Sequence, residues 1–253
     1  MAWDLTDRPV ETIPSVLHRV QRRLAVGTPV EVAVDPDVGA GRLVDLVVGA
    51  GFSTRRAPSG GGRGPLVVAA SRARTLADSV APDLRLLVCG VNPSLYSADA
   101  GVGYARPGNR FWPAVLAAGV ATVDRDPLAA LTGGLGMTDF AKRATRTAAE
   151  VTRDEYEAGF ARVTRLVDWL RPDAVCFVGL SGWRTVVDRH AVAGLQPTPI
   201  GGRPAYVMPS TSGLNARTPL SELVDHLVAA WTLTGTTGPA GRASPGTRPG
   251  TVR

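Results

Sequence analysis

The sequence predicts an α/β protein whose main sheet is mostly parallel and is covered by helices on both faces. Residues 84–89 and 174–179 are apolar runs without polar alternation, which is typical of strands buried on both faces of a parallel sheet. Between them, residues 152–170 place apolar side chains at helical spacing. A strand, a helix and a second strand in this order indicate a right-handed crossover unit.

Residues 1–74 predict a small α/β module ahead of the main sheet. We expect helices at 16–24 and at 41–52, the second ending at Gly49 or Gly51, and strands at 29–35 and 65–71, with a glycine-rich turn at 60–64. No catalytic motif accompanies these elements. We therefore expect an accessory module of unknown role that packs on the rest of the chain, and a ligand site of its own is the alternative.

The main domain is predicted to span residues 75–234. Six glycine and proline residues between positions 90 and 108 predict a shaped loop after the strand at 84–89. Loops at the carboxyl ends of parallel strands are where open α/β sheets bind ligands. Thr152 and Glu155 have the spacing of a capping box. The further elements expected are a loop with a short helix at 120–135, helices at 111–119, 152–170, 182–190 and 220–233, and strands at 174–179 and 204–208.

The chain is basic, but the charge is spread unevenly. Its 253 residues carry a net charge of +6, yet residues 81–234 hold 15 basic against 14 acidic residues. DNA binding by this part would therefore depend on local placement of arginines and not on a global field. The candidates are Arg106, Arg110, Arg143, Arg146 and Arg217. Residues 235–253 are rich in glycine and proline, so we expect a disordered basic tail.

The cysteine count and the hydropathy argue against an iron–sulfur protein, a secreted protein and a membrane protein. Cys89 and Cys176 both fall in predicted buried strands, so two reduced core thiols are expected. Two cysteines are too few for a four-cysteine iron–sulfur cluster. No spacing of His, Cys and carboxylates suggests a metal site, and we expect no cofactor. The absence of a signal peptide pattern and of a long apolar run predicts a cytoplasmic protein without a membrane partner.

Two motifs carry a resemblance to a known family. GVNPS at 90–94 with YARPGNRFW at 104–112, and MPSTSGLNAR at 208–217, resemble the two active-site motifs of the mismatch-specific uracil-DNA glycosylases. That branch of the uracil-DNA glycosylase superfamily contains the bacterial mismatch-uracil and the eukaryotic thymine-DNA glycosylases. GMTDFAKRAT at 136–145 is similar to a segment that borders the base pocket in the family.

The resemblance implies a three-layer α/β/α fold and the hydrolysis of an N-glycosidic bond in duplex DNA. The expected substrate is uracil opposite guanine, with thymine and modified bases as further candidates. The enzyme would flip the base out of the stack and act in base excision repair as a monomer. Lys142, the chain's only lysine, lies outside the pocket positions, so no lyase activity is expected.

The resemblance assigns Asn92 to the catalytic role of placing the attacking water. An amide orients a water but cannot take a full proton at neutral pH, so a slow enzyme that depends on a good leaving group is expected. An asparagine that only closes a turn is the alternative reading. The base pocket is expected to contain Val91, Ser94, Ser97, Tyr104 and Asp139. Of these, Tyr104 would stack on the flipped base.

Two of these positions depart from the family pattern. Ser94 stands where the family has Gly, which bears on how closely the backbone approaches the base. Asp139 stands where the family has Asn or Lys, so a carboxylate beside the base could alter the range of bases accepted. The alternative for Asp139 is a helix cap or an ion pair with Lys142 or Arg143.

The second motif predicts a wedge that fills the space left by the flipped nucleotide. Leu214 would enter the duplex, with Ser212, Gly213 and Arg217 contacting phosphate or the widowed guanine. Asn109 and Arg110 are expected to brace the loop or touch phosphate, and Phe111 and Trp112 to lie in the core. Two alternatives stay open: a superfamily relative with a shifted base preference, and a module that binds damaged DNA without excision.

Overall fold

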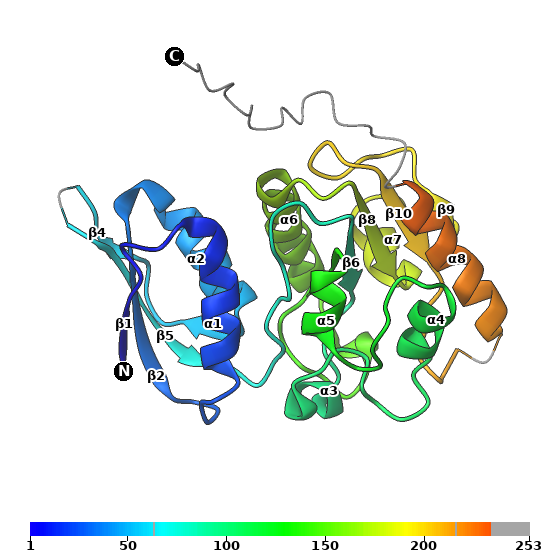
Figure 1. Ribbon diagram of the computed structural model, residues 1–253, viewed down its shortest axis with the longest axis horizontal. Helices are drawn as coiled ribbons and strands as arrows, with labels where there is room; N and C mark the ends of the chain where they lie inside the picture. Colours follow the sequence, from blue (N-terminus) through cyan, green and yellow to red (C-terminus); the bar gives the residue numbers. More distant parts are fainter. Residues whose placement is uncertain (63, 216, 234–253) are drawn as a thin grey trace, which may run out of the picture.

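The computed structural model describes residues 1–62, 64–215 and 217–233. Within these residues the strands form two five-stranded sheets, one in the N-terminal part of the chain and one in the remainder (Figure 1). The predicted disordered tail at 235–253 lies outside the described residues. Among the described helices, none combines the length and the apolar character that crossing a bilayer requires.

The N-terminal module is a mostly antiparallel sheet with two helices. Strands β2 and β5 pair antiparallel, β1 is parallel to β2, and β3 and β4 both pair with β5. The predicted second helix ends at Gly49, and Phe52 begins a strand that the sequence did not indicate. The elements are β1 (Ala2–Asp4), α1 (Ile13–Gln21), β2 (Pro29–Val34), α2 (Ala40–Gly49), β3 (Phe52–Thr54), β4 (Ser59–Gly60) and β5 (Leu66–Arg72).

The main sheet confirms the predicted fold class. Its order is β7-β6-β8-β10-β9, and every pairing is parallel except that of β9 with β10. Its strands are β6 (Leu86–Gly90), β7 (Leu135–Asp139), β8 (Ala174–Val178), β9 (Gly194–Leu195) and β10 (Ala205–Met208). The sequence did not indicate β7 as a strand, and β7 lies at the edge, beside β6.

Helices cover both faces of this sheet, which makes three layers. Leu87 and Cys89 of β6 face a core with α6 and α7, whereas Leu86 and Val88 face a core with α4, α5 and α8. This alternation is the period of two that a buried strand has. The helices are α3 (Leu95–Ala100), α4 (Phe111–Ala117), α5 (Pro127–Thr132), α6 (Arg153–Leu170), α7 (Leu180–Val186) and α8 (Leu220–Thr232).

Residue patterns in the sequence located the start of α6 correctly but did not predict the short helix α3. The capping box of Thr152 and Glu155 is present at the start of α6. The loop predicted throughout 90–108 is wrong for residues 95–100, which form the short helix α3. The Ser94 side chain caps this helix by accepting a hydrogen bond from the backbone of Ser97. Phe111 and Trp112 lie in the core as expected, with exposed fractions of 0% and 1%.

The N-terminal module packs on α6 and on the segment 73–83 that joins the two sheets. Asp45 of α2 forms an ion pair with Arg165 of α6, with 2.7 Å between carboxylate and guanidinium. The guanidinium of Arg42 lies 5.4 Å from the centre of the Trp169 ring. Packing of the N-terminal module on the rest of the chain was expected. The domain boundary at residue 74 and the role of this module stay predictions.

Candidate active site

A cavity of about 550 Å³ opens at the carboxyl ends of β6 and β7. Its wall contains residues from both predicted motifs, although they are more than one hundred positions apart in the chain. Three predicted residues, Arg110, Gly213 and Arg217, are outside the wall. The predicted site residues that line the cavity are Val91, Asn92, Ser94, Ser97, Tyr104, Asn109, Asp139, Ser212 and Leu214.

The Asn92 side chain is held in one orientation at this wall. Its Nδ2 donates to the backbone oxygen of Arg143 at 2.9 Å and to Oγ1 of Thr145 at 2.7 Å. The Arg143 carbonyl can only accept, so the NH2 group must be on that side of the amide. Oδ1 is therefore left as a hydrogen-bond acceptor on the other side of a half-buried side chain that lines the cavity.

The segment after β7 holds the loop that carries Asn92. Thr145 N donates to Pro93 O at 3.1 Å, and Leu95 N donates to Thr145 O at 3.1 Å. Thr145 is 3% exposed, and its hydroxyl also donates to Thr147 O at 2.7 Å. Thr145 thus fixes both the backbone and the side chain at the Asn92 position.

Ser94 and Ser97 shape the first turn of α3. Oγ of Ser97 accepts a hydrogen bond from the backbone of Ala105 at 3.2 Å, which ties the helix to the loop before Arg106. The Ser94 hydroxyl donates to Ser97 Oγ at 3.1 Å. The departure from Gly at position 94 therefore has a local structural consequence, because it supplies the helix cap.

Tyr104 lies against the cavity in a constrained conformation. Its φ of 58° is in the left-handed region, where few residues other than glycine are found. The ring stacks on Phe111 with 4.0 Å between centroids. Its Oη is buried without a hydrogen-bond partner among the described residues, and burial raises the pKa of Tyr104 well above its usual value. The hydroxyl therefore stays protonated at neutral pH.

Gly90, at the end of β6, allows Tyr104 and Asp139 to approach each other. A Cβ at this position would lie 2.9 Å from Tyr104 Oη and would collide with Oδ1 of Asp139. Only glycine leaves room for both polar groups at the strand end. The two groups consequently lie together at the inner wall of the cavity.

The Asp139 carboxylate has no hydrogen bond or ion pair within the described part of the chain. The helix-cap alternative is wrong, because Asp139 ends β7 and none of the described helices starts there. The ion-pair alternative is also wrong, because Lys142 pairs with Asp78 and Arg143 pairs with Glu155. Burial raises the pKa of Asp139 to about 6, although Lys142 acts in the opposite direction. An acid with such a pKa changes charge close to neutral pH.

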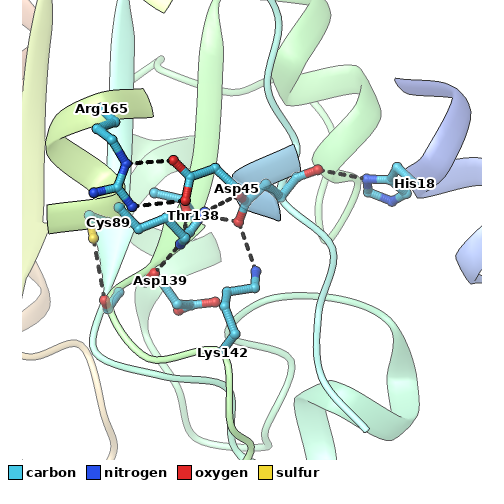
Figure 2. A network of polar contacts seen from close by, with 10 residues as sticks. His18, Asp45, Cys89, Thr138, Asp139, Lys142 and Arg165 are labelled. Carbon is cyan, nitrogen blue, oxygen red and sulfur yellow. Dashed lines mark hydrogen bonds and ion pairs between the residues drawn. The ribbon is translucent and has the colours of Figure 1, made fainter. Parts of the chain in front are cut away.

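A buried charge cluster supports the end of β7. Asp78 accepts from Lys142 Nζ at 2.7 Å and from Arg162 Nη1 at 2.8 Å, and the Thr138 hydroxyl donates to it at 2.8 Å. Figure 2 shows Thr138, Asp139 and Lys142 gathered around this network. Burial raises the pKa of Asp78, but the cations Arg162 and Lys142 outweigh burial and hold it below its ordinary value.

This cluster holds the backbone of Asp139 in place and keeps the ammonium group of Lys142 in an ion pair. Arg162 Nη2 donates to the backbone oxygen of Asp139 at 2.9 Å and to Thr138 Oγ1 at 2.8 Å. The Lys142 side chain is only 10% exposed and its ammonium group binds Asp78. A charged, paired amine is a poor nucleophile.

Arg110 holds the loop at 208–217 in place through hydrogen bonds to its backbone and to the residue that follows it. Its guanidinium donates to the backbone oxygens of Ser212, Asn215 and Thr218. Asn109 accepts from Phe111 N at 2.9 Å, so of the two expected roles for Asn109 and Arg110 the contacts show bracing. A Cβ on Gly213 would lie 2.8 Å from the Gly108 backbone oxygen, so the two motif loops touch there.

Leu214 projects from this braced loop with 80% of its surface exposed. Its backbone N donates to Ser212 Oγ at 3.3 Å, which keeps the turn closed. Arg217 is exposed beyond the cavity wall. Asn92 and Leu214 thus line one cavity, and the first of them is open to it.

Sequence reasoning missed three features of the site. His18, from α1 of the N-terminal module, lines the cavity and binds the backbone oxygen of Asp78 through Nδ1 at 3.1 Å. Thr145 was seen only as part of a motif. Arg162 was not singled out in the sequence, although it is buried with 5% of its surface exposed. Within the described residues no group of His, Cys and carboxylates could hold a metal ion.

Two comparisons relate this chain to known proteins. A solution NMR structure of a proposed uracil DNA glycosylase from Methanosarcina acetivorans is similar at 19% sequence identity, with a TM-score of 0.46, over 63% of this chain and 97% of that one. The family description "Uracil DNA glycosylase superfamily" matches residues 77–232, which include the whole main sheet and both motifs. Since this match spans more than half of the chain, the protein belongs to the uracil DNA glycosylase superfamily.

Proposed function

We propose that the protein is a monofunctional, mismatch-specific DNA glycosylase that removes uracil opposite guanine from duplex DNA. Thymine and modified bases are further candidate substrates. One observation carries the proposal: an oriented asparagine, Asn92, and a highly exposed leucine, Leu214, line the same cavity at the carboxyl end of a parallel sheet. Base excision needs both a held water and a side chain that fills the vacated place in the duplex.

In the proposed reaction a water attacks C1′ of the deoxyribose. Oδ1 of Asn92 accepts one hydrogen bond from that water and directs an oxygen lone pair at the sugar carbon. The C1′–N1 bond breaks, the uracil ring leaves with the bonding electron pair, and the water's proton passes to solvent or to the base. The products are the free base and an abasic site.

The Asp139 carboxylate supports a role in choosing the base. It lines the cavity, has no ion pair within the described residues, and has a pKa of about 6. When ionised it can accept a hydrogen bond from N3–H of uracil or thymine. When protonated it can donate to a base that presents an acceptor. Because the two protonation states of Asp139 bind different bases, this carboxylate favours the alternative of a superfamily relative with a shifted base preference, and the preference would depend on pH.

The ion pair of Lys142 supports the proposal that the enzyme is monofunctional, without lyase activity. A lyase step needs an uncharged amine that forms a Schiff base with the sugar. The ammonium of Lys142 is bound to buried Asp78, 2.7 Å away. Borohydride should therefore trap no covalent complex between the protein and uracil-containing DNA.

An excision assay tests the proposal and separates it from the binding-module alternative. Wild type and Asn92→Ala are compared on duplexes with G·U, G·T and A·U pairs and on single-stranded uracil DNA. We expect wild type to release uracil fastest from G·U and the variant to release little from any substrate. Equal binding of damaged DNA by both proteins, with no release by wild type, would assign the chain to the binding-module class. Equal rates on G·U and A·U would remove the mismatch preference.

A further inference from the structure

Several arginines surround the mouth of the cavity, but they are not equally available to a ligand. Arg110 is turned into the 208–217 loop, and Arg143 is paired with Glu155. Arg106 and Arg146 line the cavity and have no side-chain partner within the described residues. The glycosylase domain thus offers fewer free cations near the cavity than its sequence indicates.

The N-terminal module supplies further cations on the same side of the molecule. Arg22 and Arg23 follow the last turn of α1, both are exposed, and neither guanidinium has a partner in the described part of the chain. Figure 1 shows the lower end of α1 and the helix α3 along the same edge of the molecule.

Two contacts make this edge continuous with the cavity. Nε of Arg22 lies 3.7 Å from the position a Cβ would have on Gly101, and Gly101 lines the cavity at the end of α3. One turn earlier in α1, His18 forms part of the cavity wall. The acidic Asp99 of α3 is already paired with Arg74 at 2.5 Å, so it leaves the cations at the α1 end unpaired.

We infer that the end of α1 is a phosphate-binding surface that extends the DNA cleft of the glycosylase domain onto the N-terminal module. Arg22 and Arg23 contact the sugar-phosphate backbone of the duplex that flanks the extruded nucleotide on the α3 side. Guanidinium groups suit this contact because their paired N–H donors match phosphate oxygens. The inference rests on the proposed function for its ligand, and it gives residues 1–74 a role in substrate binding.

A purely structural role for the same arginines makes a different prediction. Cations at the carboxyl end of a helix stabilise the helix by interacting with the negative end of its dipole. That role would change thermal stability but would not change how DNA affinity depends on salt. The salt dependence therefore distinguishes the two.

The test compares two double variants of equal charge. Arg22→Ala/Arg23→Ala removes the proposed contacts. Arg55→Ala/Arg56→Ala removes an adjacent exposed pair that precedes β4, on the far side of the module from α3 (Figure 1). Binding is measured by fluorescence anisotropy across a salt series, using a duplex of roughly two helical turns with one G·U pair and a non-hydrolysable uracil analogue.

We expect the slope of log K against log salt to become shallower by about 2 for Arg22→Ala/Arg23→Ala, since each lost phosphate contact contributes close to one unit. The slope of the Arg55/Arg56 control should equal that of wild type, and Arg22→Lys/Arg23→Lys should restore most of it. Equal slopes for the two alanine variants would overturn the inference.

Excision of uracil from the G·U duplex by the same proteins is measured in parallel over a range of enzyme concentrations under single-turnover conditions. Arg22→Ala/Arg23→Ala should need a higher enzyme concentration than wild type to reach half of its maximal rate, whereas Arg55→Ala/Arg56→Ala should match wild type. If wild type releases no uracil while the difference in salt slope remains, the proposed function is wrong and the inferred DNA surface is kept. A reduced rate at saturation without a change in slope would contradict the inference alone.

Discussion

Nδ2 of Asn92 donates a hydrogen bond of 2.7 Å to Oγ1 of Thr145, which lies 53 positions later in the chain. Thr145 in turn donates to the backbone oxygen of Thr147, so its own orientation is fixed. The amide of Asn92 is consequently oriented by a second residue that does not touch the substrate in the proposed reaction. Thr145 is a positioning residue.

Thr145→Val should slow excision without weakening DNA binding. Valine keeps the volume but removes the acceptor, so Asn92 loses an interaction of about 1 kcal/mol and the rate should fall by about fivefold to tenfold. Single-turnover rates and anisotropy on the same G·U duplex measure the two quantities. Thr145→Ser keeps the hydroxyl and should retain most of the rate. Equal losses in the two variants would show that packing and not the hydrogen bond matters.

Asp139→Asn should make the protein more stable at pH 7 but not at pH 4. Because burial raises the pKa of Asp139 to about 6, the folded state holds this proton more tightly than the unfolded state. Ionisation therefore lowers stability as the pH rises from about 4 to above 6, and the full effect is on the order of 2–3 kcal/mol. Urea denaturation of both proteins at pH 4 and pH 7 measures it. The same pH dependence in both would contradict the assignment.

The same variant tests the role of Asp139 in substrate choice. Asparagine cannot ionise, so the step in excision rate expected near pH 6 for wild type should disappear. Rates on uracil, thymine and modified cytosines opposite guanine are compared for the two proteins. Identical substrate profiles would end the proposal that the carboxylate selects the base.

Leu214→Ala should impair excision from duplex DNA selectively. The side chain is 80% exposed, so its loss leaves folding unchanged. Without it, the stacking lost on base extrusion is not offset, and the rate on a G·U duplex should fall by about tenfold or more. Single-stranded uracil DNA needs no wedge and should react at the wild-type rate. Leu195→Ala, at another exposed leucine, is the matched control, and a loss of similar size there would argue against a specific wedge.

Asp78→Asn should destabilise the fold strongly. It leaves Arg162 and Lys142 buried without their counterion, which costs about 3–5 kcal/mol. Since the pKa of Asp78 is held below its ordinary value, wild type should lose this contribution as the pH falls below about 4. Asp45→Asn, which removes the more exposed pair with Arg165, should cost at most about 1 kcal/mol in the same urea denaturation.

The sequence predicted the layers of the main domain because its buried strands and capped helix leave local signals. Residues 86–90 and 174–178 are apolar throughout, and Thr152 with Glu155 marks a helix start without reference to the rest of the fold. Residues of both motif loops line one cavity, but only the resemblance, and no local signal, connected the two loops in the sequence. Local propensity at 90–94 and 208–217 indicates only turns.

The missed features depend on contacts between distant residues. β7 contains Gly136 and two polar residues at its end, and it is held as a strand by pairing with β6 and by the bridge between Ser79 and Met137. Arg162 faces inward because Asp78, 84 residues earlier, accepts from it. His18 reaches the cavity only because a second module docks beside it. No window of sequence contains both members of any of these pairs.

The position of Asp78 bears on how the protein is to be dissected. A fragment trimmed to the span shared with the family would begin at residue 77, one residue before the carboxylate that neutralises two interior cations. Such a fragment would lack the α2 backbone that contacts Asp78 at Gly49, so we expect solvent to reach the charge cluster at the end of β7. We therefore expect the smallest part of the chain that folds on its own to be longer than the span matched by the family, and deletion series should start from the full chain.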